Sequence, residues 1–441
     1  MDIFASVGGT VWTVFFFIVA LSIIIFVHEY GHYIVGRWSG IHAEVFSLGF
    51  GPVIWSRVDT RGTRWQLAAL PFGGYVKFLG DADASSVRPA DVSGLTPSER
   101  RHTMAGAPLW ARASTVAAGP IFNFILTYVV LAGLLLWTGL PQQEPTVGKL
   151  MPTPFVGETI KEGDVIVAMN GIPTPDLDAF REAGAALPPD PVIDYTVRRG
   201  TEEITLKGPH PYPPLVSMVL IRSAAMDAGL KEGDVILKAA GQDVTVFAQL
   251  PEIVNASKGE PVPLTVWRDG KTFDLTLTPR IRATEGEGGA LVEKYQIGLA
   301  SGLVFEPASR SVGAGELVTL TATEMWRMVT TTFSGLAHLI SGQISTCNLS
   351  GPIGMAETMG DAARNGLESF IGMVAVLSLG VGILNLFPIP VLDGGHLVFH
   401  AYEAVTRRPP SERALRVMMS IGLAIILSLM VFALTNDIFC V

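Results

Sequence analysis

The sequence predicts a polytopic α-helical membrane protein with four transmembrane helices, a membrane-associated β-hairpin, and two α+β domains inserted between the second and third spans. Of the 441 residues, 49% are hydrophobic and only 16% are charged, a composition too apolar for an ordinary soluble protein. Four apolar stretches are long enough to cross a bilayer, since about 20 helical residues span roughly 30 Å of hydrocarbon. They cover residues 11–35, 114–140, 371–392 and 417–436.

The distribution of basic residues predicts the orientation of these spans. Nine Lys and Arg residues lie between the first and second spans and four between the third and fourth, whereas residues 1–10 and 437–441 contain none. Because basic loops favour the cytoplasmic side, both termini and the long segment after residue 140 are expected outside. The first run, which no basic residue precedes, is expected to be a retained span and not a signal peptide. The net charge of −9 argues against nucleic acid as a partner.

A short motif at the inner end of the first span predicts a metal site. In His28-Glu29-Tyr30-Gly31-His32, the two histidines lie one helical turn apart on one face and can bind one Zn²⁺. Glu29 beside them can take a proton from a metal-bound water. Placing these polar groups in hydrocarbon costs roughly several kcal/mol, which favours a functional cluster. The alternative is a packed polar cluster without a metal.

A catalytic zinc usually has three protein ligands, so a further ligand is expected in another span. Asp393 ends the predicted third span at the same cytoplasmic depth as His28, because both spans run inward from the same side. Pro388 and Pro390 break the helix before it, which frees backbone groups that could hold an extended peptide next to the metal. His396 is a rival ligand, although it could simply cap the end of the helix.

Residues 44–79 alternate like β-strands and are rich in glycine, including Gly49, Gly51, Gly73 and Gly74. Between two spans, this pattern predicts a hairpin that lies against the membrane or dips into it. Non-helical backbone survives at that depth only where it is buried in protein or faces a water-filled cavity. The edge of such a hairpin could pair with an unwound substrate strand; a plain surface hairpin is the alternative.

A repeat predicts two similar domains in the outer segment. The residues Lys161-Glu162-Gly163-Asp164-Val165-Ile166 recur 70 positions later, from Lys231 to Ile236, and each copy continues into a helix and a strand pair. The Gly-Asp-Val-Ile turn resembles PDZ domains, which bind extended peptides at a sheet edge. The alternative is a β-rich spacer without a ligand.

The resulting domain organisation has five parts. They are a membrane core over residues 1–140, PDZ-like domains over 141–213 and 214–303, an amphipathic helical connector over 304–369, and the last two spans over 370–441. The connector carries charges that make it unsuitable for crossing the bilayer, so it is expected on the outer membrane surface. Cys347 and Cys440 show no spacing pattern that would establish a disulfide or a metal site.

The chain resembles the site-2 protease family of intramembrane zinc metalloproteases. The resemblance rests on the first-span motif, on Gly119, Pro120 and Asn123 in the second span, and on the Asn-x-x-Pro-x-Pro-x-Leu-Asp-Gly pattern from Asn385 to Gly394 in the third. It implies that zinc is held by His28, His32 and Asp393, that Glu29 is the general base, and that Asn385, Pro388 and Pro390 lie by the substrate. Some relatives carry an Asn where this chain has Gly380, so a contact by that Asn is not expected here.

The family also implies an activity and a location. These proteases cleave transmembrane segments of single-span membrane proteins, such as an anti-sigma factor or a signal-peptide remnant, often after a first cleavage outside. The protein is therefore expected in a bacterial inner membrane, with its site toward the cytoplasm. A catalytically inactive PDZ scaffold is an alternative, although it would have no use for Glu29. A metal transporter would show an inverted repeat of spans, and none is visible.

Overall fold

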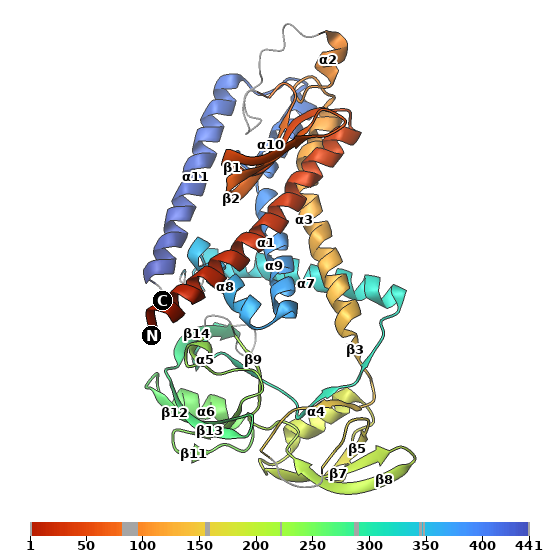
Figure 1. The fold of residues 1–441 in the computed structure, drawn as a ribbon, viewed down its shortest axis with the longest axis vertical. Coiled ribbons are helices and arrows are strands. Elements are labelled where there is room, and N and C mark those ends of the chain that lie inside the picture. Colours follow the sequence, from red (N-terminus) through yellow and green to blue (C-terminus); the bar gives the residue numbers. More distant parts are fainter. Residues whose placement is uncertain are drawn as a thin grey trace. The chain divides into compact units, whose positions relative to one another are not determined.

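The computed structural model describes residues 2–81, 96–154, 159–220, 223–285, 291–343, 346 and 349–439. Four of its helices are long and apolar enough to cross a membrane (Figure 1). They are α1 (Asp2–Trp38), α3 (Leu109–Thr138), α9 (Leu367–Asn385) and α11 (Glu412–Phe439). The predicted polytopic membrane protein with four apolar helices is therefore confirmed. Cys347 and Cys440 lie outside the described residues.

The third span is shorter than predicted. Helix α9 ends at Asn385, not at residue 392, because Pro388 and Pro390 lack the N–H groups that would continue it. A new helix, α10 (Asp393–Thr406), starts at Asp393. Asp393 therefore opens a helix and does not close the third span. His396 lies in the first turn of α10, so the expectation that it caps a helix end was wrong.

The chain divides into two compact units: residues 1–134 with 318–441, called here the membrane unit, and residues 135–317, called the insert unit. In the membrane unit, Ala20 and Ile24 of α1 pack with Met359 of α8 (Pro352–Arg364) and Phe370 of α9. Asp437 near the end of α11 accepts hydrogen bonds from the backbone N–H groups of residues 351, 353 and 354. These bonds satisfy the free donors at the start of α8 and fix it to α11.

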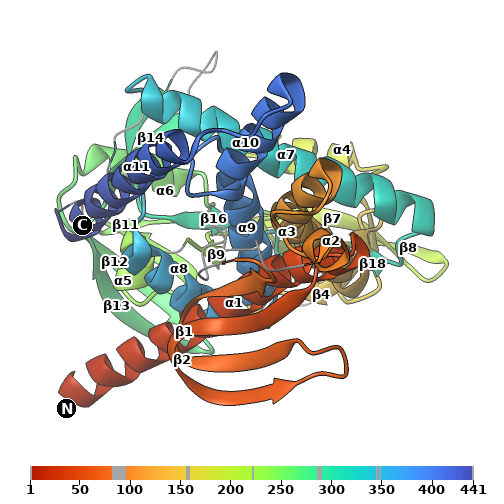
Figure 2. The same ribbon diagram turned by 90° about the horizontal axis from the view of Figure 1, so that it is seen from above.

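The predicted hairpin is formed by β1 (Ala43–Val58) and β2 (Arg64–Phe78), which lie beside α1 (Figure 2). Residues 45–48 of β1 pair with both ends of β2, because the strands bend back at glycines with positive φ, among them Gly49 at +90° and Gly73 at +135°. Phe46, Val76 and Phe78 pack against Tyr33 of α1. Large apolar side chains remain exposed at the far end of the hairpin; among them are Phe50, Ile54, Trp55 and Phe72. The short α2 (Pro97–Arg101) precedes α3.

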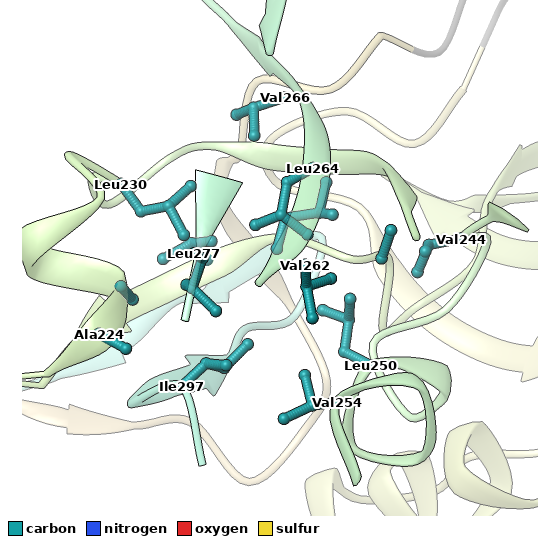
Figure 3. Packing of buried hydrophobic residues seen from close by; sticks show 14 of the residues in the cluster. Ala224, Leu230, Val244, Leu250, Val254, Val262, Leu264, Val266, Leu277 and Ile297 are labelled. Carbon is teal, nitrogen blue, oxygen red and sulfur yellow. The ribbon is translucent and has the colours of Figure 1, made fainter. Parts of the chain in front are cut away.

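The insert unit contains two modules of the same architecture. In the first module, the sheet order is β6-β5-β7-β8, and in the second it is β11-β10-β12-β13. The first comprises β5 (Val165–Met169), β6 (Ile172–Pro173), α4 (Leu177–Ala186), β7 (Val192–Arg199) and β8 (Glu202–Pro209). The second comprises α5 (Ala224–Asp227), β10 (Val235–Ala239), β11 (Gln242–Asp243), α6 (Gln249–Ala256), β12 (Val262–Arg268) and β13 (Lys271–Leu277). Figure 3 shows the second core, where Leu250 and Val254 of α6 pack with Val262 and Leu264 of β12.

The repeated Lys-Glu-Gly-Asp segment forms the same turn in both modules. Asp164 accepts from the Lys161 backbone N–H at 2.8 Å and forms a bidentate ion pair with Arg199 of β7. Asp234 makes the corresponding bonds to the Lys231 N–H and to Arg268 of β12. Both carboxylates are almost fully buried. Burial alone would raise the pKa of Asp164, but the Arg199 guanidinium and the Lys161 N–H more than offset it, so that this pKa is lowered.

Short strand pairs complete the modules. They are β3 (Leu140–Pro141) with β18 (Ser309–Arg310), β4 (Val147–Leu150) with β17 (Phe305–Pro307), β9 (Val216–Val219) with β16 (Leu299–Ser301), and β14 (Arg280–Glu285) with β15 (Leu291–Gln296). The expected boundary at residue 304 differs from this structure, because Val304 and Phe305 are buried in the core of the first module. The chain then enters α7 (Ala314–Ile340), an exposed amphipathic helix.

Candidate metal centre

Three side chains predicted to bind metal meet in the membrane unit. His28 and His32 lie one turn apart on α1, and their Nε2 atoms are 3.2 Å apart. Asp393, the first residue of α10, places Oδ2 3.2 Å from His28 Nε2 and 3.5 Å from His32 Nε2. The structure thus brings together residues 365 positions apart in the chain.

The donor set fits a zinc ion. Tetrahedral zinc with ligand bonds of about 2.0–2.1 Å places its ligand atoms about 3.3 Å from one another, close to the separations seen here. Oδ2 of Asp393 is buried and accepts no hydrogen bond among the described residues. A buried carboxylate oxygen facing two imidazole nitrogens is costly unless a cation or a proton lies between them. A metal ion at their centre would satisfy all three atoms.

Helix α3 orients both imidazole rings. Nδ1 of His32 lies 2.9 Å from the backbone oxygen of Thr115, so Nδ1 carries the proton and Nε2 stays free to bind a metal. The Asn123 carboxamide lies 3.1 Å from His28 Nδ1, and its buried Oδ1 has no partner within the described ranges of the chain. With the carboxamide turned, Oδ1 would accept from Nδ1–H of His28. A side chain at Gly119 would collide with both rings, which explains a glycine there.

Glu29 lies beside the three ligand atoms but outside their group. It lines the same cavity as Gly74 and Val76 of β2. A Cβ on Gly74 would approach Glu29 Cγ to 3.1 Å, so only glycine lets this strand lie so close to α1. The end of β2 therefore forms one wall next to the carboxylate.

The cavity at this centre has a volume of about 350 Å³, within the range of small-ligand sites. Of the predicted substrate-binding residues, Asn385 and Gly74 line it, whereas the lining does not include Pro388, Pro390, Gly49, Gly51 or Gly73. His396 lines the cavity but is not part of the metal-binding group. Among the residues that the structure describes, no atom lies within 4 Å of a Cβ placed on Gly380.

Sequence reasoning missed one ion pair that supports the centre. Arg112 of α3 donates two hydrogen bonds, of 3.0 and 2.7 Å, to Glu403 of α10. The side chains are only 17% and 19% exposed. In the sequence, Arg112 is one of the nine basic residues that predict the orientation of the spans. No pattern connects it with Glu403. The pair ties the helix that begins with Asp393 to the helix that orients the histidines.

Breaking this pair is expected to weaken metal binding without removing a ligand. Arg112→Met should lower zinc affinity by about tenfold, since groups that position ligands typically contribute this much. Affinity is measured by zinc retention against a competing chelator, with Arg413→Met at an exposed site as the control. The double variant Arg112→Met/Glu403→Met should recover part of the loss, because it leaves no unpaired carboxylate. Wild-type affinity in Arg112→Met would show that the pair does not position Asp393.

Comparison with known proteins places the chain in a family. Residues 16–429 match the model of peptidase family M50. A protein of Agrobacterium fabrum that carries the provisional name zinc metalloprotease is 36% identical over 99% of this chain and 98% of its own length. The Salmonella typhimurium protein named regulator of sigma-E protease RseP is 34% identical over 97% of this chain and 98% of its own length. The chain therefore belongs to peptidase family M50, the site-2 proteases that its motifs resemble.

Proposed function

We propose that this protein is a zinc-dependent endopeptidase that cleaves transmembrane segments of membrane proteins within the bilayer. One observation carries the proposal: the ligand atoms of His28, His32 and Asp393 lie together in the cavity that Glu29 also lines. The two histidines and Glu29 belong to α1, a helix apolar enough to span a membrane. The proposed zinc ligands are these three residues. Zinc is also the metal in the name of the Agrobacterium fabrum relative. An inactive scaffold would have no use for a carboxylate held beside the ligands. An active protease is therefore favoured over a catalytically inactive PDZ scaffold.

Bound zinc supplies a Lewis acid that polarises the scissile carbonyl and activates water. Glu29 accepts the proton of the attacking water and passes it to the leaving amine. The hydrogen bonds of α3 to His32 and His28 keep both Nε2 atoms directed at one point. Hydrolysis needs water, which the cavity lined by Glu29 and Asp393 can admit.

The hairpin is the proposed binding surface for the substrate. A transmembrane helix hides its carbonyl groups in its own hydrogen bonds, so the substrate must be extended before cleavage. Residues 74–78 pair with β1, and Gly74 and Val76 of this segment line the cavity that contains Glu29. A substrate strand laid along this edge would place its backbone beside the metal. Gly49, Gly51 and Gly73 shape the hairpin, while Asn385, Pro388 and Pro390 contribute the irregular backbone between α9 and α10.

The proposed substrates are single-span membrane proteins, which have already lost an outer domain. Because one relative is named a regulator of sigma-E protease, an anti-sigma factor is a candidate, as are signal-peptide remnants. The two modules of the insert unit are proposed to be PDZ-like domains that bind extended peptides. The five-part organisation is kept, with residues 304–307 assigned to the first module and α7 to the outer membrane surface.

Removal of the metal tests the activity. The purified protein in liposomes should cut a co-reconstituted single-span reporter, lose this activity with 1,10-phenanthroline, and regain it with added zinc. Product formation is followed by gel electrophoresis and mass spectrometry. Cleavage that persists after verified metal removal would contradict a zinc-dependent mechanism.

The proposed orientation places both termini and the insert unit in the periplasm and the metal centre toward the cytoplasm. Single cysteines in a background without Cys347 and Cys440 test it. A cysteine at Ser257 of the insert unit should react with an impermeant thiol reagent in cells whose outer membrane has been permeabilised. One at Ser411, between α10 and α11, should react only after lysis. The reverse pattern would invert the topology.

A further inference from the structure

A second cavity lies inside the insert unit, where the two modules meet. Its volume is about 450 Å³. The end of α4 supplies one wall with Ala185 and neighbouring residues, and the start of α6 with the turn before it supplies another. The segment joining the modules closes it with His210 and Tyr212. The size suits a short peptide segment or a small ligand.

Hydrogen bonds and close packing hold these walls in place. Thr245 Oγ1 donates to the backbone oxygen of Pro189 at 2.8 Å, which links the second module to the first. The backbone N–H of Phe247 donates to the backbone oxygen of Tyr212. A Cβ on Gly184 would lie 2.9 Å from the Tyr212 ring, so this glycine lets the ring pack against α4. The cavity is therefore a built part of the folded pair of modules.

One residue that lines this cavity, His210, carries a polar atom without a partner among the described residues. His210 is 4% exposed, and its Nδ1 accepts a hydrogen bond from the Tyr212 N–H at 3.1 Å. A neutral ring that accepts at Nδ1 carries its proton on Nε2. Burial lowers the pKa of His210, which keeps the ring neutral near pH 7. Nε2 is buried and has no hydrogen-bond partner in the part of the chain that the structure describes, so an N–H donor is left unsatisfied there.

The remaining polar groups restrict the ligand. The Gln249 side-chain oxygen already accepts from the N–H groups of Thr245 and Val246, so it is engaged within the protein. Glu252 adds a negative charge to the lining, which disfavours an anion. The other walls are largely apolar, with Leu187 and Phe247 among them. The chemistry suits an uncharged acceptor carried by an apolar body.

We infer that this cavity binds an uncharged, apolar peptide segment whose backbone carbonyl accepts a hydrogen bond from Nε2–H of His210. Resting on the proposed function, the segment belongs to the extramembrane part of the substrate. A backbone carbonyl is favoured over a carboxylate because the donor is neutral and Glu252 is close. The site is formed by both modules together and by the segment between them.

Photolabelling of the full-length protein tests the inference. The probe is the pentapeptide Ala-Ala-photoleucine-Ala-Ala, N-acetylated and C-amidated, and the labelled residues are mapped by mass spectrometry. Labels are expected in residues 184–189 and 246–252. The peptide with a free C-terminal carboxylate should label less, and Glu252→Gln should reduce that difference. Stronger labelling by the free acid would overturn the preference for an uncharged segment.

Matched variants separate the cavity from its surroundings. Ala185→Trp fills the cavity and should abolish labelling, whereas Ala186→Trp, at the next exposed position outside the lining, should not. His210→Phe should weaken binding by about tenfold, the usual effect of one lost hydrogen bond, and His210→Gln should restore much of it. Equal labelling of the two Trp variants would overturn the site.

Reporter cleavage then tests whether the segment comes from the substrate. Ala185→Trp should raise KM more than Ala186→Trp while kcat stays unchanged. Equal KM values would show that the cavity does not receive the substrate, which overturns that part of the inference. Labelling needs no proteolysis, so absence of cleavage in the wild-type protein would count against the proposed function and leave the binding result standing.

Discussion

Glu29→Gln is expected to lower the rate of reporter cleavage by roughly 10²- to 10⁴-fold while the protein keeps one zinc ion. The amide cannot accept a proton from the attacking water, but it has nearly the same size. Because Glu29 lies outside the group of three ligand atoms, its charge is not required to hold the metal. Rates are measured in liposomes, and zinc is measured by atomic absorption on the same preparation.

The control for this variant is Glu412→Gln, at an exposed position in the first turn of α11. It should behave as the wild-type protein in both measurements. If Glu29→Gln cleaved at the wild-type rate, Glu29 would not be the base. If it lost zinc, the carboxylate would act at the metal and not only on the proton.

Asp393→Ala is expected to lower zinc affinity by at least about a hundredfold and to abolish cleavage, since one of three protein ligands is removed. His28→Ala should have a similar effect. Neither imidazole can replace the lost oxygen, because α3 fixes the direction of both rings. Affinity is measured by competition with a chromogenic chelator.

Glu403→Gln serves as the comparison on the same helix, because it alters the Arg112 contact and leaves Asp393 in place. Its loss of affinity should be much smaller than that of Asp393→Ala. Equal zinc affinity in Asp393→Ala and the wild-type protein would remove Asp393 from the metal centre and direct attention to His396, which lines the same cavity.

The parts of the site that could be predicted from sequence either lie close together in the chain or are required by the chemistry of a zinc site. His28, Glu29 and His32 occupy one helical turn, so their shared face follows from helix geometry alone. Asp393 could be predicted because a catalytic zinc usually has three protein ligands and this acid ends the predicted third span at the same depth as His28. The four long apolar helices followed from hydrocarbon thickness and side-chain polarity.

Other features depend on contacts that no local pattern records. The ion pair of Arg112 with Glu403 joins residues 291 positions apart. Val304 and Phe305 return to the first module after the chain has formed the second, so a contiguous boundary could not describe them. The end of α9 at Asn385 was missed because the residues beyond it remain apolar, although their prolines already indicated a break.

The position of the cut in the substrate tests the central claim most directly. A single-span reporter with a uniform apolar segment, reconstituted with the wild-type protein, is digested and the product masses are determined. The account predicts one main cut inside the apolar segment, toward its cytoplasmic end, and no cut with Glu29→Gln. Cleavage confined to the extramembrane parts, or the same cut with Glu29→Gln, would contradict a zinc endopeptidase acting within the bilayer.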